Sequence, residues 1–151
     1  MVADSPEANS TCTESAACLL DPDCVKCLRK KLSAVGVVVF FKDEDDWRIG
    51  SFEGEIPWEA CQVDFECMLN FGVPDVLANR EGGLLITDDD EAHSFFPKLQ
   101  GLFSGKTVVA AAVAFQDLKG VRLAWRENSS PFNIQDLKTI RCYGQCPADC
   151  I

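Results

Sequence analysis

The chain has 151 residues, of which 47% are hydrophobic, and this is enough for one ordinary domain that buries its core without help from a metal or a disulfide. Twenty-four acidic residues against fourteen Lys and Arg give a net charge of -10, which argues against nucleic acid as a partner. The longest apolar runs, residues 34–41 and 108–115, are far shorter than the roughly 20 residues that span a bilayer. The composition therefore predicts a soluble protein with no direct membrane insertion.

The start of the chain predicts an extension, a helix and a hairpin. Residues 1–20 are polar and poor in large apolar side chains, which is typical of an extension outside the core. The pair Asp21-Pro22 suits the cap and first turn of a helix that runs to about Ser33. Residues 34–41 then predict a strand, and residues 47–52 predict its return after the acidic turn KDEDD.

The middle of the chain predicts helices around one short strand. Pro57 begins a helix that Gly72 ends, and residues 74–79 add a short helical stretch. Residues 84–87 predict a brief strand, and residues 95–103 predict a short helix or a structured loop. The first of these helices carries one apolar face, formed by Trp58, Cys61, Phe65, Met68 and Leu69.

The last third predicts a second hairpin and a final helix. Strands at residues 107–115 and 121–126 enclose the connection 116–120. Asn133 caps the helix, with Asp136 near the capping-box position. The order of helix, hairpin, helices, strand, helix, hairpin and helix predicts a single α+β domain with a central antiparallel sheet.

Three stretches of the second half resemble the GAF domain family. They are the strand LLITD at residues 84–88, the hairpin at residues 108–123 and the final helix at residues 132–140. The resemblance extends over about residues 21–143 and leaves residues 144–151 as a cysteine-rich tail. It implies that the N- and C-terminal helices pack together on one side of the sheet, while loops on the other face form a pocket for a small molecule.

The specialised members of this family are not matched. Bilin-binding members attach the chromophore to a cysteine beside a histidine, whereas His93 has Ala92 and Ser94 as neighbours. The signature of cyclic-nucleotide-binding members is not traceable. Methionine-sulfoxide-reducing members use cysteines of the pocket region, and only Cys61 and Cys67 lie in the corresponding part of this chain.

No catalytic constellation is recognisable in the sequence. We therefore expect a non-enzymatic GAF-like binding or interaction module without a cofactor. We expect other protein subunits as partners, in the role of an accessory or structural subunit of a larger assembly, and a small-molecule ligand is compatible with the fold. The alternative is a redox sensor, in which cysteines bind an iron-sulfur cluster or zinc, or switch between thiol and disulfide.

The cysteines crowd the two ends of the chain, with three of them in the closing segment RCYGQCPADCI. Side-by-side terminal helices would bring both groups together, so we expect at least one bridge between the ends. Cys24 and Cys27 also have the spacing of a zinc or iron-sulfur half-site, and plain free thiols are the third interpretation. Because the number is odd, at least one thiol stays unpaired within the chain. The disulfide candidates are Cys12, Cys18, Cys24, Cys27, Cys61, Cys67, Cys142, Cys146 and Cys150.

Two other pairings stay open, one within the tail and one between Cys61 and Cys67. Disulfides persist in oxidising compartments, so the bridges predict an organelle lumen or secretion, with a leader that this chain does not contain. The alternative is the cytosol, since no signal peptide is visible.

The other candidate site residues have plainer interpretations. His93 is expected to be solvated, and the acidic runs 43–46 and 88–91 are expected to be exposed turns rather than calcium loops. Aromatic residues at strand and helix spacing belong to a core more often than to a pocket. The tryptophans in question are Trp47, Trp58 and Trp125.

Overall fold

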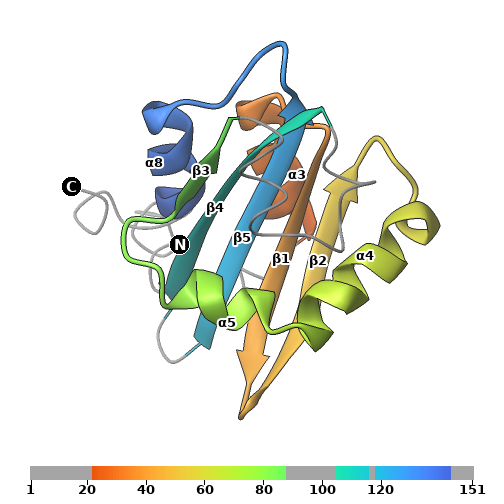
Figure 1. The fold of residues 1–151 in the computed structure, drawn as a ribbon, viewed down its shortest axis with the longest axis vertical. Coiled ribbons are helices and arrows are strands. Elements are labelled where there is room, and N and C mark those ends of the chain that lie inside the picture. The colour runs from red at the N-terminus through yellow and green to blue at the C-terminus, as the bar shows by residue number, and fades with distance from the viewer. Residues whose placement is uncertain (1–21, 88–104, 116–117, 144–151) are drawn as a thin grey trace, which may run out of the picture.

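The computed structural model describes residues 22–87, 105–115 and 118–143, which form an α+β domain around one antiparallel sheet (Figure 1). The strand order is β2-β1-β5-β4-β3. The strands are β1 (Gly36–Asp43), β2 (Asp46–Gly54), β3 (Leu84–Ile86), β4 (Lys106–Phe115) and β5 (Leu118–Glu127). The helices are α3 (Pro22–Leu32), α4 (Trp58–Asn70), α5 (Val73–Ala78) and α8 (Ile134–Cys142). The predicted fold class is confirmed.

Helices cover both faces of the sheet, so its central strands are apolar on both sides. Along β1, Val38 and Phe40 point to the face under α4 and α5, while Val37 and Val39 point to the face under α3 and α8. This follows from the two-residue period of a strand. It also explains why β1 and β4 read as continuous apolar runs in the sequence.

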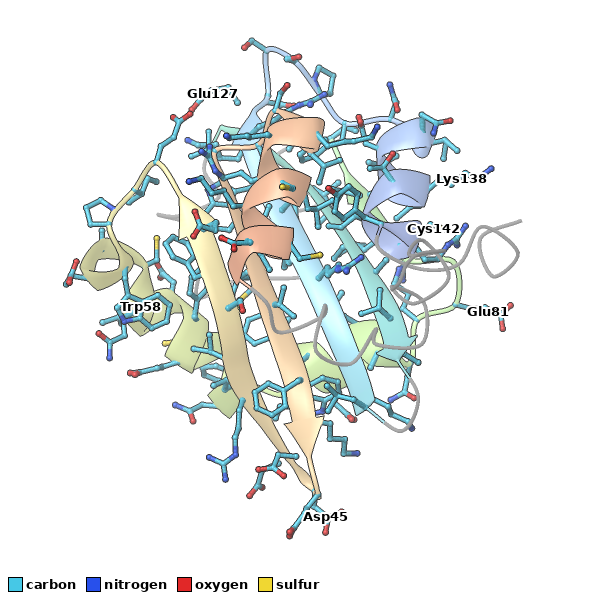
Figure 2. All side chains as sticks on the ribbon, turned by 180° about the vertical axis from the view of Figure 1, so that it is seen from behind. Asp45, Trp58, Glu81, Glu127, Lys138 and Cys142 are labelled. Atoms are coloured by element: carbon cyan, nitrogen blue, oxygen red, sulfur yellow. The ribbon has the colours of Figure 1, made fainter. Side chains whose placement is uncertain are left out.

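The terminal helices α3 and α8 pack on the same face and run in opposite directions. Arg126 joins the end of α3 to the start of α8: its Nη1 donates to the Leu32 carbonyl, and its Nη2 lies 3.5 Å from Asp136 Oδ2. Its guanidinium also lies 4.2 Å from the centre of the Phe132 ring. The start of α3 and the end of α8 therefore lie together at the other end of the helix pair, over the middle of the sheet, which confirms the predicted placement of the two helices (Figure 2).

Both ends of α8 are held by side chains. The predicted cap is confirmed as a full capping box, in which Asp136 N donates to Asn133 Oδ1 at 3.0 Å and Asn133 N donates to Asp136 Oδ2 at 2.9 Å. At the other end, the buried Arg122 of β5 donates Nη1 to the carbonyls of Ile140 at 3.0 Å and Tyr143 at 2.7 Å. These bonds satisfy carbonyls that the helix itself leaves without a partner.

One predicted boundary is wrong. The connection of the second hairpin was expected over residues 116–120, but β5 already begins at Leu118, which pairs with Phe115. Lys119 and Gly120 continue the ladder opposite Ala114 and Val113. Strand pairing outweighs the local turn propensity of residues 118–120, because each of these residues extends a ladder that is already in register. The predicted segment 95–103, His93 and the acidic run 88–91 lie outside the described residues.

Candidate functional site

The sheet face beneath α4 is filled by aromatic rings. Trp125 of β5 is fully buried and lies 5.8 Å from Phe65 and 6.4 Å from Phe52, measured between ring centroids. Trp58 packs at 5.6 Å from Phe52 and Phe40 at 6.2 Å from Phe65. The core interpretation of Trp125 is confirmed, and Trp58 packs against the same cluster. The described part of this face is a packed core.

The two cysteines of α4 are not placed for redox chemistry with each other. Burial raises the pKa of the Cys61 thiol, and the carboxylate of Asp64 raises it further, so this thiol stays protonated and unreactive. Burial also raises the pKa of Asp64. Cys67 follows six residues later, and the rise of about 1.5 Å per residue puts it about 9 Å along the helix axis. A disulfide needs a Cα separation of roughly 4.4–6.8 Å, so α4 does not allow this bridge.

α5 crosses the sheet near the end where β1 turns into β2 (Figure 1). Two adjoining hollows are lined by the end of α5 and the residues that follow it. The first measures about 260 Å³ and the second about 350 Å³. They share the lining residues Ala78, Asn79 and Ala112, so we treat them as one feature, the α5 groove.

The α5 groove exists because β3 is short and β4 carries small side chains. Only Val108 to Ala110 of β4 pair with β3. Beyond them Ala111 and Ala112 line the groove, and the small side chains leave space that larger ones would fill. Gly83 lets the preceding loop lie against β4: a Cβ there would be 2.8 Å from the Ala110 carbonyl oxygen, and its φ of +82° suits glycine alone.

The first hollow contains two lysines on neighbouring strands. Because Phe41 pairs with Gly120, Lys42 and Lys119 are the next positions outward on β1 and β5, and the strand period puts both on the face of α5. Trp47 of β2 pairs with Lys42 and donates its Nε1 hydrogen to Asp75 Oδ1 of α5 at 3.4 Å. Trp47 therefore packs against the core, as the sequence predicts, and also lines the groove.

The second hollow contains two arginines. Arg80 follows α5 and donates Nε to the Gly83 carbonyl at 3.0 Å, while Arg141 comes from the last turn of α8. Glu81 also lines this hollow, but Figure 2 shows its side chain extending outward from the loop. Of the described lining residues, the sequence singled out only Trp47, which was expected in the core, and its one other signal is Lys42, which ends the apolar run of β1.

The predicted cysteine sites are only partly described. Cys24 and Cys27 lie on the first turns of α3, and Cys142 lies on the last turn of α8, where Figure 2 labels it. The antiparallel packing of these helices puts all three at the same end of the helix pair. Within the described part of the chain, no disulfide involves Cys27, Cys61 or Cys67. The remaining candidates, Cys12, Cys18, Cys146 and Cys150, lie outside the described residues.

The described residues contain neither a cluster of metal ligands nor a helix that could cross a membrane. No three side chains of His, Cys, Asp or Glu among them are grouped so as to hold a metal ion. None of the described helices has the length and apolar character needed to cross a membrane.

Comparison with known proteins finds matches among solved structures only. No family model and no curated protein matches the chain. A GAF domain/HD domain protein from Geobacter sulfurreducens superposes with a TM-score of 0.57 at 21% identity, over 85% of this chain and 90% of that one. The nlh2 GAF domain of A. aeolicus in an inactive state gives 0.56 at 17%, over 92% and 91%. The GAF domain of an Acinetobacter phosphoenolpyruvate-protein phosphotransferase gives 0.57 at 13%, over 85% and 80%.

Proposed function

From the GAF-like fold of this chain, we propose a non-enzymatic module that binds a small molecule in the α5 groove. The observation that carries the proposal is the groove itself, an open concave site next to a sheet whose central part is fully packed. Ligand sites are typically concave, with a few polar groups placed around an apolar floor.

The groove offers groups that hold a ligand rather than transform one. Its described lining contains Lys, Arg, Asn, Asp, Glu and Trp side chains, and none of Ser, Thr, Cys or His. Among the described lining residues there is therefore no hydroxyl or thiol nucleophile with an adjacent base. Binding without turnover is the activity that this set of side chains supports. An accessory role in a larger assembly stays a prediction.

Filling the groove should abolish binding. Ala112 belongs to both hollows, so Ala112→Phe is expected to occupy their shared wall and to remove every fragment that binds the wild-type protein. Ligand-observed NMR with a library of polar fragments measures this. Val63→Phe is the matched control, because Val63 is 68% exposed on α4 and lines neither hollow. Fragments that bind wild type and Ala112→Phe equally, or the absence of any binder, would contradict the proposal.

The proposal includes a disulfide staple between the ends of the chain. The antiparallel packing of α3 and α8 supports it, because Cys24 and Cys27 lie near the start of one helix and Cys142 ends the other, so that all three lie at the same end of the helix pair. A staple of this kind persists in an oxidising compartment, which we propose as the location of the protein.

Peptide mapping without reduction tests the staple. We expect a peptide containing Cys142, Cys146 or Cys150 to be linked to one containing Cys12, Cys18, Cys24 or Cys27. Cys61 is the internal reference, because its buried thiol should stay unmodified until the protein unfolds. If every terminal cysteine is alkylated before reduction, the staple and the proposed compartment are both wrong.

The redox-sensor alternative makes a different prediction. In this alternative, Cys24 and Cys27 form one half of a zinc or iron-sulfur site, and the four cysteines outside the described residues are candidates for the other half. Visible absorbance together with iron and zinc analysis of the purified protein separates the two functions. Stoichiometric metal would favour the sensor over the non-enzymatic binding module.

A further inference from the structure

The α5 groove gathers positive charge in a chain that is acidic overall. Its described lining has four basic and two acidic residues, whereas the whole chain has fourteen basic and twenty-four acidic ones. The six charged residues of the lining are Lys42, Arg80, Lys119, Arg141, Asp75 and Glu81. A local reversal of the overall charge favours a ligand of opposite sign, since charges within about 8 Å dominate at physiological salt.

The two lysines of the first hollow lack an anionic partner among the described residues. The ion pairs found among the described residues involve neither Lys42 nor Lys119. Among the described residues that line this hollow, Asp75 is the only acidic one, and its Oδ1 accepts the indole hydrogen of Trp47. Like charges on adjacent positions of neighbouring strands repel each other. An anion bound between Lys42 and Lys119 would offset this repulsion and accept a charge-assisted hydrogen bond from each ammonium group.

The surroundings of the lysines suit a flat apolar body. The Trp47 side chain borders the hollow on β2, and Ala112, Val113 and Ala114 border it on β4. The arginines lie toward the other end of the groove: Arg80 follows α5, whereas Arg141 reaches the second hollow from α8, on the opposite face of the sheet, past the edge of β4. Along β4, Ala111 of the second hollow and Ala114 of the first are about 10 Å apart, a distance that a small organic molecule with two acid groups can bridge.

We propose that the α5 groove binds a small, flat organic dianion, with one acid group between Lys42 and Lys119 and the other toward Arg80 and Arg141. This inference rests on the proposed function, because it assumes that the groove is the binding site. It adds the chemical class of the ligand and the residues that select it.

Titration with matched probes tests the class of ligand. The dianion terephthalate is expected to bind about tenfold more tightly than the monoanion benzoate, and the uncharged terephthalamide is expected not to bind. Inorganic phosphate, which has no apolar body, is expected to bind more weakly than terephthalate. Isothermal titration calorimetry at low salt measures the affinities. NMR should show the largest shift changes at Lys42 and at the Trp47 indole.

Charge-removing variants test the residues. Lys42→Met and Lys119→Met are each expected to weaken terephthalate about tenfold or more, because each removes a charge-assisted hydrogen bond. Lys138→Met is the matched control: it removes the same charge from the exposed outer side of α8, away from both hollows (Figure 2). Far-UV circular dichroism confirms that each variant is folded.

The outcomes distinguish the inference from the proposed function. Equal affinity for terephthalamide and terephthalate, or equal weakening by Lys138→Met, would overturn the dianion inference. So would phosphate binding as tightly as terephthalate. If neutral fragments bind wild type but not Ala112→Phe while every anion fails, the dianion inference is wrong and the proposed function stands. If nothing binds in the groove, both are wrong.

Discussion

Replacing Trp125 with alanine is expected to lower the free energy of unfolding by about 3–5 kcal/mol. The Trp125 ring is fully buried between β5 and α4, in contact with Phe52 and Phe65, and its removal leaves a cavity that these rings cannot close. A domain of this size has a stability of about 5–15 kcal/mol, so the variant should be close to unfolding at physiological temperature. Urea denaturation followed by far-UV circular dichroism measures the loss.

Gly36 is coupled to the same ring. Gly36 pairs with Trp125 across β1 and β5, and a Cβ at Gly36 would lie 2.5 Å from the indole. We therefore expect Gly36→Ala to cost about 1–3 kcal/mol by overpacking, and Trp125→Phe to relieve part of that cost. A double-mutant cycle should show the coupling. Val63→Ala, at an exposed position of α4, is the control and should change stability by less than about 0.5 kcal/mol. Additive effects would show that the two residues do not share this contact.

Replacing Arg122 with methionine is expected to lower the free energy of unfolding by about 2–3 kcal/mol. Arg122 is buried beneath the end of α8, and its Nη1 donates to the carbonyls of Ile140 and Tyr143. Methionine fills a similar volume but donates no hydrogen bond, so these carbonyls lose a charged donor at the negative end of the helix dipole. Chemical denaturation measures the global effect.

The place where Arg122→Met loosens the structure tests whether the lost stability comes from the end of α8. Amide hydrogen exchange should speed up in the last turn of α8 before it does so in β1, because the hydrogen bonds that are lost hold that turn. Arg48→Met is the matched control, since Arg48 is exposed and pairs only with the exposed Asp43 at 3.2 Å. A surface pair of this kind contributes about 0–1 kcal/mol. If the two variants lose the same stability, the capping role of Arg122 is wrong.

The sequence by itself determined those elements that depend on local chemistry. The capping box at Asn133 and Asp136 needs only two side chains three residues apart, and it appears as predicted. The apolar face of α4 likewise follows from helical spacing, and Cys61, Phe65 and Met68 are buried on it. The apolar runs of β1 and β4 identified two central strands, because both faces of the sheet are covered.

Only the tertiary structure decided where the candidate site lies. Lys42 and Lys119 are far apart in the sequence and become neighbours through the register of β1 on β5, which no local pattern specifies. The groove itself depends on β3 beginning only at Leu84, opposite Ala110, and leaving the next alanines of β4 without a covering strand among the described residues. The packing of the whole sheet determines register and strand length. A binding site formed by residues that only this register brings together therefore cannot be predicted from local sequence patterns.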